Sequence, residues 1–206
     1  MGTRTYEQRA RAEEAERTRM RIIEAVLERL REVPAEPVAI GRIARMAGVA
    51  RSTVYAIFGS RAGLFDAVGR ELALRSGYER LVDAKHQPDA REHLRVGMRA
   101  ACEMLAANSD IHRALRAMAR LDAEAVGGVV SRIDAERAAG MRRLVGRLAD
   151  QGVLRDGLGR KRAEDILFML SSFETFDALY TDRGMSVARV AELLIEIAER
   201  ALYERP

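Results

Sequence analysis

The chain has 206 residues, enough for one large domain or two small ones with a proper hydrophobic core. Because no run reaches the roughly 18 consecutive apolar residues of a membrane span and the N-terminus lacks a secretory apolar stretch, we expect no membrane contact and a cytoplasmic protein. The single cysteine, Cys102, excludes an internal disulfide.

The net charge of +4 is concentrated near the N-terminus. Residues 1–70 hold 13 arginines and 9 acids, whereas residues 71–206 hold 22 charges of each sign. Within 37–70, five arginines accompany a single acid, Asp66. A local basic segment favours an anionic partner such as nucleic acid, although a composition biased towards arginine also accounts for so modest an excess.

The first predicted helix, 13–32, follows from an apolar stripe that stops before the prolines of VPAEP, 33–37. The stripe consists of Ile22, Ile23, Val26, Leu27 and Leu30. Arginines alternate with glutamates around the start of this helix. The arginines concerned are Arg4, Arg9, Arg11 and Arg17. They form either an arm that follows the DNA backbone or minor groove, or a solvated tail, which the interleaved glutamates favour.

Two short helices are predicted next, at 40–46 and 52–58, with Gly48 between them. Glycine enters the left-handed conformation of such a turn without a Cβ penalty. The polar side of the second helix carries Arg51, Ser52, Tyr55 and Ala56. Two short helices around a glycine turn form a helix-turn-helix, whose second helix enters the DNA major groove N-terminal end first.

The segment IGRIARMAGVARSTVYAIFGSRAGLFDAV, 40–68, resembles the N-terminal domain of TetR-family transcriptional regulators. The resemblance is carried by Ile43-Ala44, Ala47-Gly48-Val49, Thr53-Val54-Tyr55, Phe58, and Ser60 followed by a basic residue and Leu64. It implies a homodimer that binds palindromic, double-stranded operator DNA, usually as a repressor, and a small effector that alters DNA affinity. The later helices resemble the family in layout only.

Carried over by position, the resemblance implies base contacts from Arg51, Ser52 and Ala56. It implies phosphate contacts from Thr53, Tyr55 and Arg61.

The sequence departs from the family's pattern where helix caps are usual. Val38-Ala39 replaces a hydroxyl residue, Ala50 stands where serine is common, and Ala62-Gly63 replaces an acidic pair. Arg42 and Arg45 are predicted to compensate as DNA contacts, because both lie on the polar side of the helix 40–46.

Helices are predicted to fill the rest of the chain, at 61–84, 89–107, 111–121, 123–151, 160–182 and 187–203, with a glycine-rich loop at 151–160. We therefore predict an all-α fold with a DNA-binding domain over 1–60 and an effector-binding and dimerisation domain over 61–206. The helix 61–84 is expected to be a rigid rod that joins the two.

Methionines and aromatic residues at helical spacings suit a cavity for an apolar or amphipathic effector, although such stripes are more often plain core. The candidate effector residues are Met98, Cys102, His112, Arg116, Phe168, Phe173 and Phe176. Wide apolar faces at the chain end predict a four-helix dimer interface. Its candidate residues are Ile166, Leu170, Phe173, Tyr180, Val190, Leu194 and Ile197.

No catalytic or metal-ligating arrangement stands out, so we expect no enzyme, no metal and no cofactor. Two alternatives remain: a C-terminal domain that recruits a protein partner, or an all-α enzyme with a DNA-binding appendage. An enclosed cavity of roughly a few hundred Å³ favours an effector. A solid core favours the partner.

Overall fold

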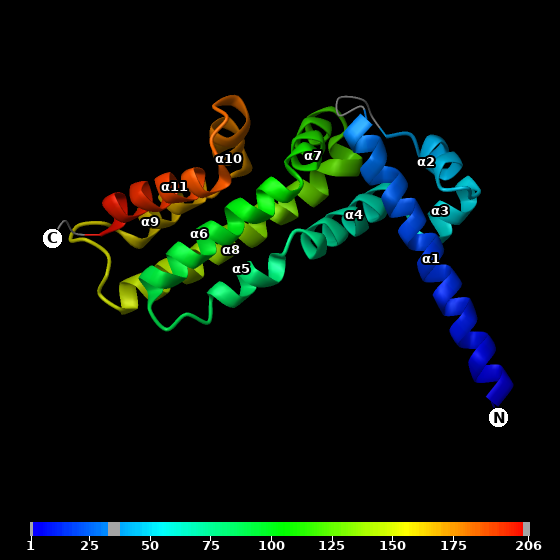
Figure 1. Cartoon of the computed structure of the whole chain (residues 1–206), viewed down its shortest axis with the longest axis horizontal. Helices are drawn as coiled ribbons and strands as arrows, with labels where there is room; N and C mark the ends of the chain where they lie inside the picture. Colours follow the sequence, from blue (N-terminus) through cyan, green and yellow to red (C-terminus); the bar gives the residue numbers. More distant parts are fainter. Residues whose placement is uncertain (1, 33–37, 204–206) are drawn as a thin grey trace. The chain divides into compact units, whose positions relative to one another are not determined.

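The computed structural model describes residues 2–32 and 38–203, and over these residues the fold is all-α as predicted (Figure 1). The helices in chain order are α1 (Gly2–Glu32), α2 (Ile40–Met46), α3 (Arg51–Phe58), α4 (Arg61–Arg75), α5 (Tyr78–Ala84), α6 (Ala90–Ala107), α7 (Ser109–Leu121), η1 (Ala123–Gly127), α8 (Gly128–Asp150), α9 (Arg160–Leu170), α10 (Phe173–Asp177), η2 (Ala178–Asp182) and α11 (Val187–Leu202). The elements η1 and η2 are π-helical.

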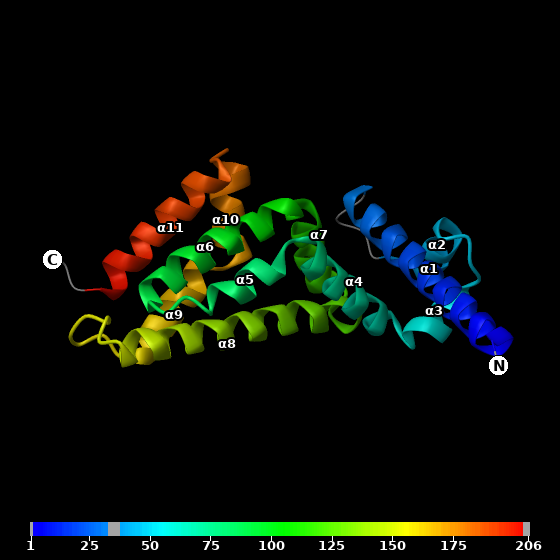
Figure 2. The same ribbon diagram turned by 60° about the horizontal axis from the view of Figure 1, so that its bottom comes forward.

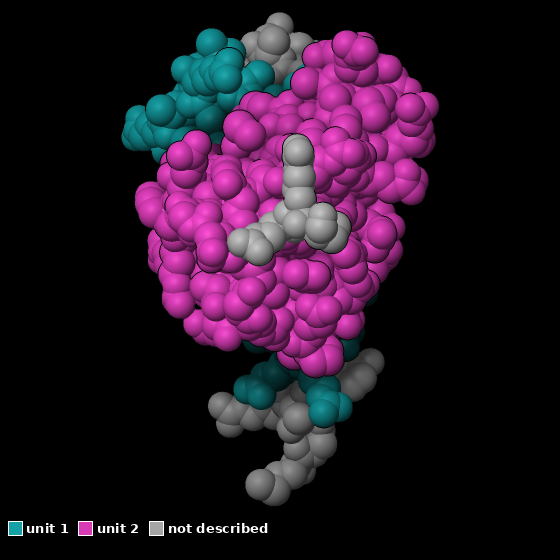
Figure 3. Space-filling view, turned by 90° about the vertical axis from the view of Figure 1, so that its left-hand side faces the viewer, with its two compact units in different colours: residues 1–71, 113–130 teal, residues 72–112, 131–206 magenta. Residues whose placement is uncertain are grey.

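Two compact units divide the described residues (Figure 3). Unit 1 combines residues 1–71 with 113–130, and unit 2 combines 72–112 with 131–206. The segment 113–130 therefore packs with the helix-turn-helix region, although it lies far from that region in sequence. Three helices, α4, α7 and α8, have residues in both units.

The core of unit 1 is built around the predicted stripe of α1. Each of its five residues, from Ile22 to Leu30, is at most 1% exposed. Burial of an aliphatic side chain contributes about 1.5–3 kcal/mol to folding, so this stripe anchors the unit. Further buried residues of unit 1 come from α2 to α4, α7, η1 and α8: Ile43, Val54, Leu64, Phe65, Val68, Leu115, Met118, Val126 and Val129.

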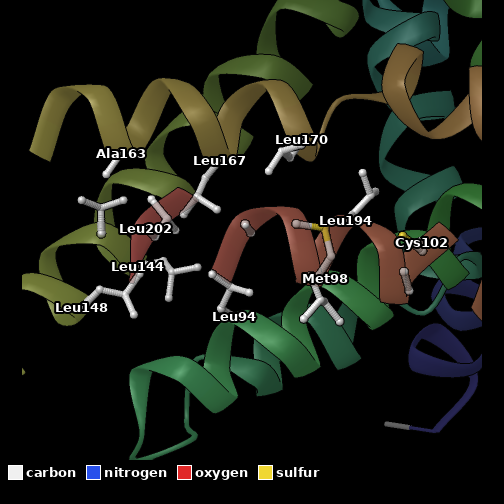
Figure 4. Packing of buried hydrophobic residues seen from close by; sticks show 14 of the residues in the cluster. Leu94, Met98, Cys102, Leu144, Leu148, Ala163, Leu167, Leu170, Leu194 and Leu202 are labelled. Atoms are coloured by element: carbon white, nitrogen blue, oxygen red, sulfur yellow. The ribbon is translucent and has the colours of Figure 1, made fainter. Parts of the chain in front are cut away.

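The core of unit 2 lies among α6, α8, α9 and α11 (Figure 4). Helix α6 packs against both α5 and α11 (Figure 2). Apolar residues at spacings of three and four make this possible, because they place one continuous apolar side on each helix. The labelled members of this core are Leu94, Met98, Cys102, Leu144, Leu148, Ala163, Leu167, Leu170, Leu194 and Leu202.

The prediction of one continuous helix over 61–84 is wrong. Helix α4 ends at Arg75 and α5 begins at Tyr78, because Gly77 between them adopts a left-handed φ of 75°. The Ser76 hydroxyl donates to the Leu72 carbonyl at 2.6 Å and accepts from the Asn108 amide nitrogen at 3.0 Å. These bonds hold the break in place, so the segment is two helices and not one rigid rod.

The predicted helix 160–182 is interrupted as well. Helix α9 ends at Leu170, and Ser172 caps the separate helix α10 by accepting a hydrogen bond from the Thr175 N–H at 3.1 Å. A serine that satisfies the free N–H groups of a new helix favours a fresh start over continuation of the old one. The predicted helix 123–151 likewise begins as η1 and continues as α8 from Gly128.

None of the helices within 2–32 and 38–203 combines the length and the apolar character that crossing a membrane requires. The described residues contain no β-strand; the one β-type pairing among them is an isolated antiparallel bridge between Leu154 and Tyr203.

Candidate nucleic-acid interface

Gly48 forms the predicted turn between α2 and α3. Its φ is 65°, in the left-handed region. The Gly48 N–H donates to the Arg45 carbonyl at 3.1 Å, and the Val49 N–H donates to the Ala44 carbonyl at 2.9 Å. This pair of bonds is a Schellman motif, which satisfies the last carbonyls of α2 and redirects the chain into α3.

Helix α3 has one buried side and one exposed side. Val54 is 1% exposed, and Thr53, Ile57 and Phe58 are half-buried. The residues predicted to line the other side are all exposed: Arg51, Ser52, Tyr55 and Ala56. Because the exposed side begins at the first residue of the helix, its polar groups lie where a helix-turn-helix meets base edges.

Arg51 rests on Tyr55, one helical turn away. Its Nη2 donates to the Tyr55 hydroxyl at 3.4 Å, and its guanidinium carbon lies 5.6 Å from the ring centroid. Contact with an aromatic ring restricts the rotamers of an arginine, which reduces the entropy it loses on binding. Sequence spacing placed these two residues on one side of the helix but did not indicate that they touch.

Neither short helix has a side-chain cap at its N-terminus. Ala39 and Ala50 occupy the two capping positions, as the departures from the family's pattern predicted. Helix α4, in contrast, is capped by Ser60, whose hydroxyl accepts from the Gly63 N–H at 3.0 Å. A Cβ atom on Gly63 would lie 2.1 Å from the Phe58 carbonyl oxygen, so this close approach of α4 to the end of α3 requires glycine.

The two arginines of α2 are both exposed. Arg42 Nη2 lies 3.6 Å from Glu32 Oε2, and both side chains are about half exposed, at 47% and 49%. An exposed pair of this kind contributes at most about 1 kcal/mol and is readily exchanged for another partner. Arg42 therefore remains available for an anion, as does the exposed Arg45.

Arg61 is bonded within unit 1. Its Nη2 donates to Asp122 Oδ2 at 2.5 Å and to the Val38 carbonyl at 3.1 Å. Its side chain is 35% exposed. No local sequence signal points to Asp122 as its partner, because 61 positions separate the two residues.

Comparison with known proteins agrees with this geometry. Residues 22–68 match the family model described as "Bacterial regulatory proteins, tetR family". NalD, the secondary repressor of the MexAB-OprM multidrug efflux pump in Pseudomonas aeruginosa, has a crystal structure similar to this chain. Its TM-score is 0.70 at 25% sequence identity, covering 93% of this chain and 98% of that one. The chain therefore carries a TetR-family DNA-binding domain over residues 22–68 and shares its fold with the repressor NalD.

Other solved structures share the fold of this chain. FadR from Bacillus subtilis in complex with stearoyl-CoA has a TM-score of 0.72 at 18% identity, covering 89% of this chain and 99% of that one. A TetR-family regulator from Rhodococcus sp. has a TM-score of 0.67 at 17% identity, covering 91% and 99%. No curated protein sequence matches the chain.

The predicted effector residues lie mostly in the core of unit 2. Met98, Cys102, Phe173 and Phe176 are buried, and the His112 ring lies 5.5 Å from the Phe173 ring. Burial raises the pKa of the Cys102 thiol to about 12.

Two of the effector candidates have other surroundings. The Phe168 ring lies under the Arg137 guanidinium, at 3.7 Å from its carbon to the ring centroid. Arg116 belongs to unit 1, whereas the other candidates belong to unit 2.

The space between these side chains is small. No space large enough for a water molecule lies between Met98, Cys102 and Phe176 and their neighbours Ala101, Leu105, Leu170, Ser171, Ser172 and Leu194. Pockets that enclose a drug-sized ligand measure about 300–1,000 Å³. The core in this conformation is therefore closed around a space smaller than such a ligand.

The structure places four of the predicted dimer residues inside the core of unit 2. Leu170, Phe173, Val190 and Leu194 are at most 4% exposed, so a partner subunit cannot cover them. Ile166 and Tyr180 are half-buried, and Ile197 is 41% exposed. Met169, which the dimer prediction omitted, is 57% exposed. An apolar stripe shows which side of a helix is buried, but it does not show whether the same chain or a partner subunit covers that side.

A search of the described residues for groups of three or more histidine, cysteine, aspartate or glutamate side chains able to hold a metal ion finds none.

Proposed function

We propose that this regulator represses transcription by binding a palindromic operator as a homodimer, with the exposed side of α3 in the major groove. The observation that carries the proposal is the exposed run of Arg51, Ser52, Tyr55 and Ala56 directly after the Gly48 turn, inside the segment that matches the family. In such a complex, phosphate contacts set the register and base contacts select the sequence.

The contacts divide between the two short helices and the start of α4. Arg51, Ser52 and Ala56 lie against base edges, and Thr53 and Tyr55 lie against phosphates. Arg61 also lies against a phosphate, and Arg42 and Arg45 add basic groups nearby. Repression is the role favoured for the bound state, because NalD, 25% identical to this chain, is described as a repressor.

Dimerisation supplies the second half of the contact set, because one short helix reads too few bases. The apolar surface on α9 and α11 supports this step. Met169 on α9 and Ile197 on α11 are exposed, and Ile166 and Leu193, one turn earlier on the same helices, are half-buried. We assign DNA binding to residues 1–60, and effector binding and dimerisation to 61–206.

Release by an apolar or amphipathic effector is the second half of the proposal. A TetR-like fold holds stearoyl-CoA in the FadR structure, which supports a ligand of this class. We place such a ligand beside Met98, Cys102 and Phe176, where α10 must move away from α6 to admit it. Effector and DNA then weaken each other's binding by the same factor.

A protein partner in place of the effector is the second candidate, and the closed core favours it. A thermal-shift screen with acyl-CoA esters and other apolar compounds separates the two. A stoichiometric ligand whose affinity falls in the presence of operator DNA supports the effector. Absence of any ligand, together with capture of one specific protein by the DNA-bound regulator, supports the partner.

The DNA-binding proposal is tested by selecting bound duplexes from a random pool with the wild-type chain. A consensus with two-fold symmetry supports a homodimer on a palindrome. Recovery of unrelated sequences rejects sequence-specific binding.

A further inference from the structure

Arg61, the first residue of α4, is held at the junction between α7 and η1. Its Nη2 lies 2.5 Å from Asp122 Oδ2 and 3.1 Å from the Val38 carbonyl oxygen. All three residues belong to unit 1. An arginine that starts the helix directly after the recognition helix is therefore engaged by an acid from a distant part of the chain.

Asp122 is well prepared to hold a cation. Its side chain is only 15% exposed, so solvent screens the Arg61–Asp122 attraction less than it screens an exposed pair. Its second oxygen, Oδ1, accepts a hydrogen bond from the Ala125 N–H at 3.3 Å. This bond fixes the carboxylate, which presents its Oδ2 to Arg61 much as a phosphate oxygen would.

The bonding of Arg61 in this state is nevertheless incomplete. One nitrogen, Nη2, serves both acceptors, and the buried Nε has no hydrogen-bond partner. A buried donor without a partner carries a free-energy cost. A phosphate group can accept two parallel N–H bonds from the guanidinium fork, so DNA offers Arg61 a more complete set of bonds.

We propose that Asp122 competes with a DNA phosphate for Arg61 and thereby lowers the affinity of the regulator for DNA. Asp122 is a positioning residue, since it acts through Arg61 and does not touch DNA. The inference rests on the proposed function, in which Arg61 contacts the DNA backbone. Because the contact is to phosphate, Asp122 affects operator and random DNA alike.

The test compares full-length wild type with the variants Asp122→Asn, Arg61→Ala and the double variant, by fluorescence anisotropy on operator and random duplexes at several salt concentrations. Asparagine keeps an oxygen for the Ala125 N–H but turns an amide donor towards Arg61. We expect Asp122→Asn to bind both duplexes roughly 3- to 10-fold more tightly. We also expect its salt dependence to steepen by about one unit of slope.

Glu124→Gln is the matched control, because it removes the same charge from an exposed residue two positions away. It reports the general effect of removing a negative charge on DNA affinity. In the Arg61→Ala background, the effect of Asp122→Asn should fall to that of Glu124→Gln. If circular dichroism shows that Asp122→Asn is unfolded, Asp122→Ser is used in its place, because the serine hydroxyl can accept a hydrogen bond from the Ala125 N–H.

Three outcomes overturn the proposal. The first is a gain in affinity for Asp122→Asn that equals the gain for Glu124→Gln. The second is a gain that persists in the Arg61→Ala background. The third is a folded Asp122 variant that binds DNA more weakly than wild type. A failure of the proposed function looks different, because wild type then fails to prefer operator over random DNA. If wild type does prefer operator but Arg61→Ala changes neither affinity nor salt slope, the competition is rejected and the DNA-binding function stands.

Discussion

At the scale of single residues, Arg51 is the side chain that we propose to determine sequence preference. It is exposed at the start of α3 and braced by Tyr55. We predict that Arg51→Ala loses roughly 1–3 kcal/mol of binding free energy on the preferred DNA and much less on random DNA. Both affinities are measured at one salt concentration, with Arg45→Ala as the comparison. Equal losses on the two DNAs would make Arg51 a phosphate contact.

His93 gives the stability of unit 2 a dependence on pH. Its Nδ1 lies 3.0 Å from Arg147 Nη1, and burial followed by the charges of Arg147 and Arg143 lowers its pKa from 6.5 to about 4. Between these two values the unfolded chain binds a proton that the folded chain does not, so stability falls as the pH drops through this window.

The His93→Asn variant isolates this contribution, because asparagine offers Arg147 an acceptor but does not titrate. We predict that wild type loses more stability than the variant as the pH is lowered from 7 to about 4. Urea unfolding midpoints at a series of pH values measure the difference. Parallel pH profiles for the two proteins would show that His93 is protonated as easily in the folded chain as in the unfolded one.

At the scale of elements, α3 lacks a favourable N-cap. Ala50 has extended backbone angles, φ −73° and ψ 150°, which suit a capping residue, but it has no side chain to offer. Ala50→Ser should raise the free energy of unfolding by about 0.5–1 kcal/mol. Ala56→Ser, an exposed substitution within the same helix, should be neutral or slightly destabilising. Equal thermal shifts for the two variants would argue against a capping effect.

At the same scale, the proposed dimer interface includes Met169 on α9 and Ile197 on α11, which are 57% and 41% exposed. We predict that Ile197→Glu and Met169→Glu produce folded monomers that bind operator weakly. Leu74→Glu, at a side chain that is 70% exposed on α4, should leave the dimer intact. Sedimentation measures the oligomeric state, and dimers of both variants would rule out this interface.

Glutamate at Phe173 or Leu194 is not an equivalent test of the dimer. These side chains are 4% and 2% exposed and lie in the core of unit 2, so a charge there unfolds the unit.

At the scale of the whole molecule, local signals predicted the helix-turn-helix and missed the long-range contacts. The stripe of α1 and the turn at Gly48 depend on neighbouring residues, so periodicity and turn chemistry were enough to locate them. The break at Gly77 was missed because apolar spacing continues on both sides of it. The Arg61–Asp122 pair was missed because it joins segments 61 positions apart, which leaves no local pattern.

The most direct test of the account is whether the N-terminal end of α3 lies in the major groove. An iron chelate that generates hydroxyl radicals is attached to Ser52→Cys, with Lys161→Cys in unit 2 as the control. The native Cys102 is 2% exposed and burial raises its pKa to about 12, so the introduced thiol is the one that reacts.

On the selected operator, the Ser52→Cys conjugate should cleave two symmetric sites about 34–36 Å apart, or a multiple of that distance. Cleavage as weak and uniform as that of the Lys161→Cys conjugate would contradict the placement of α3 in the major groove.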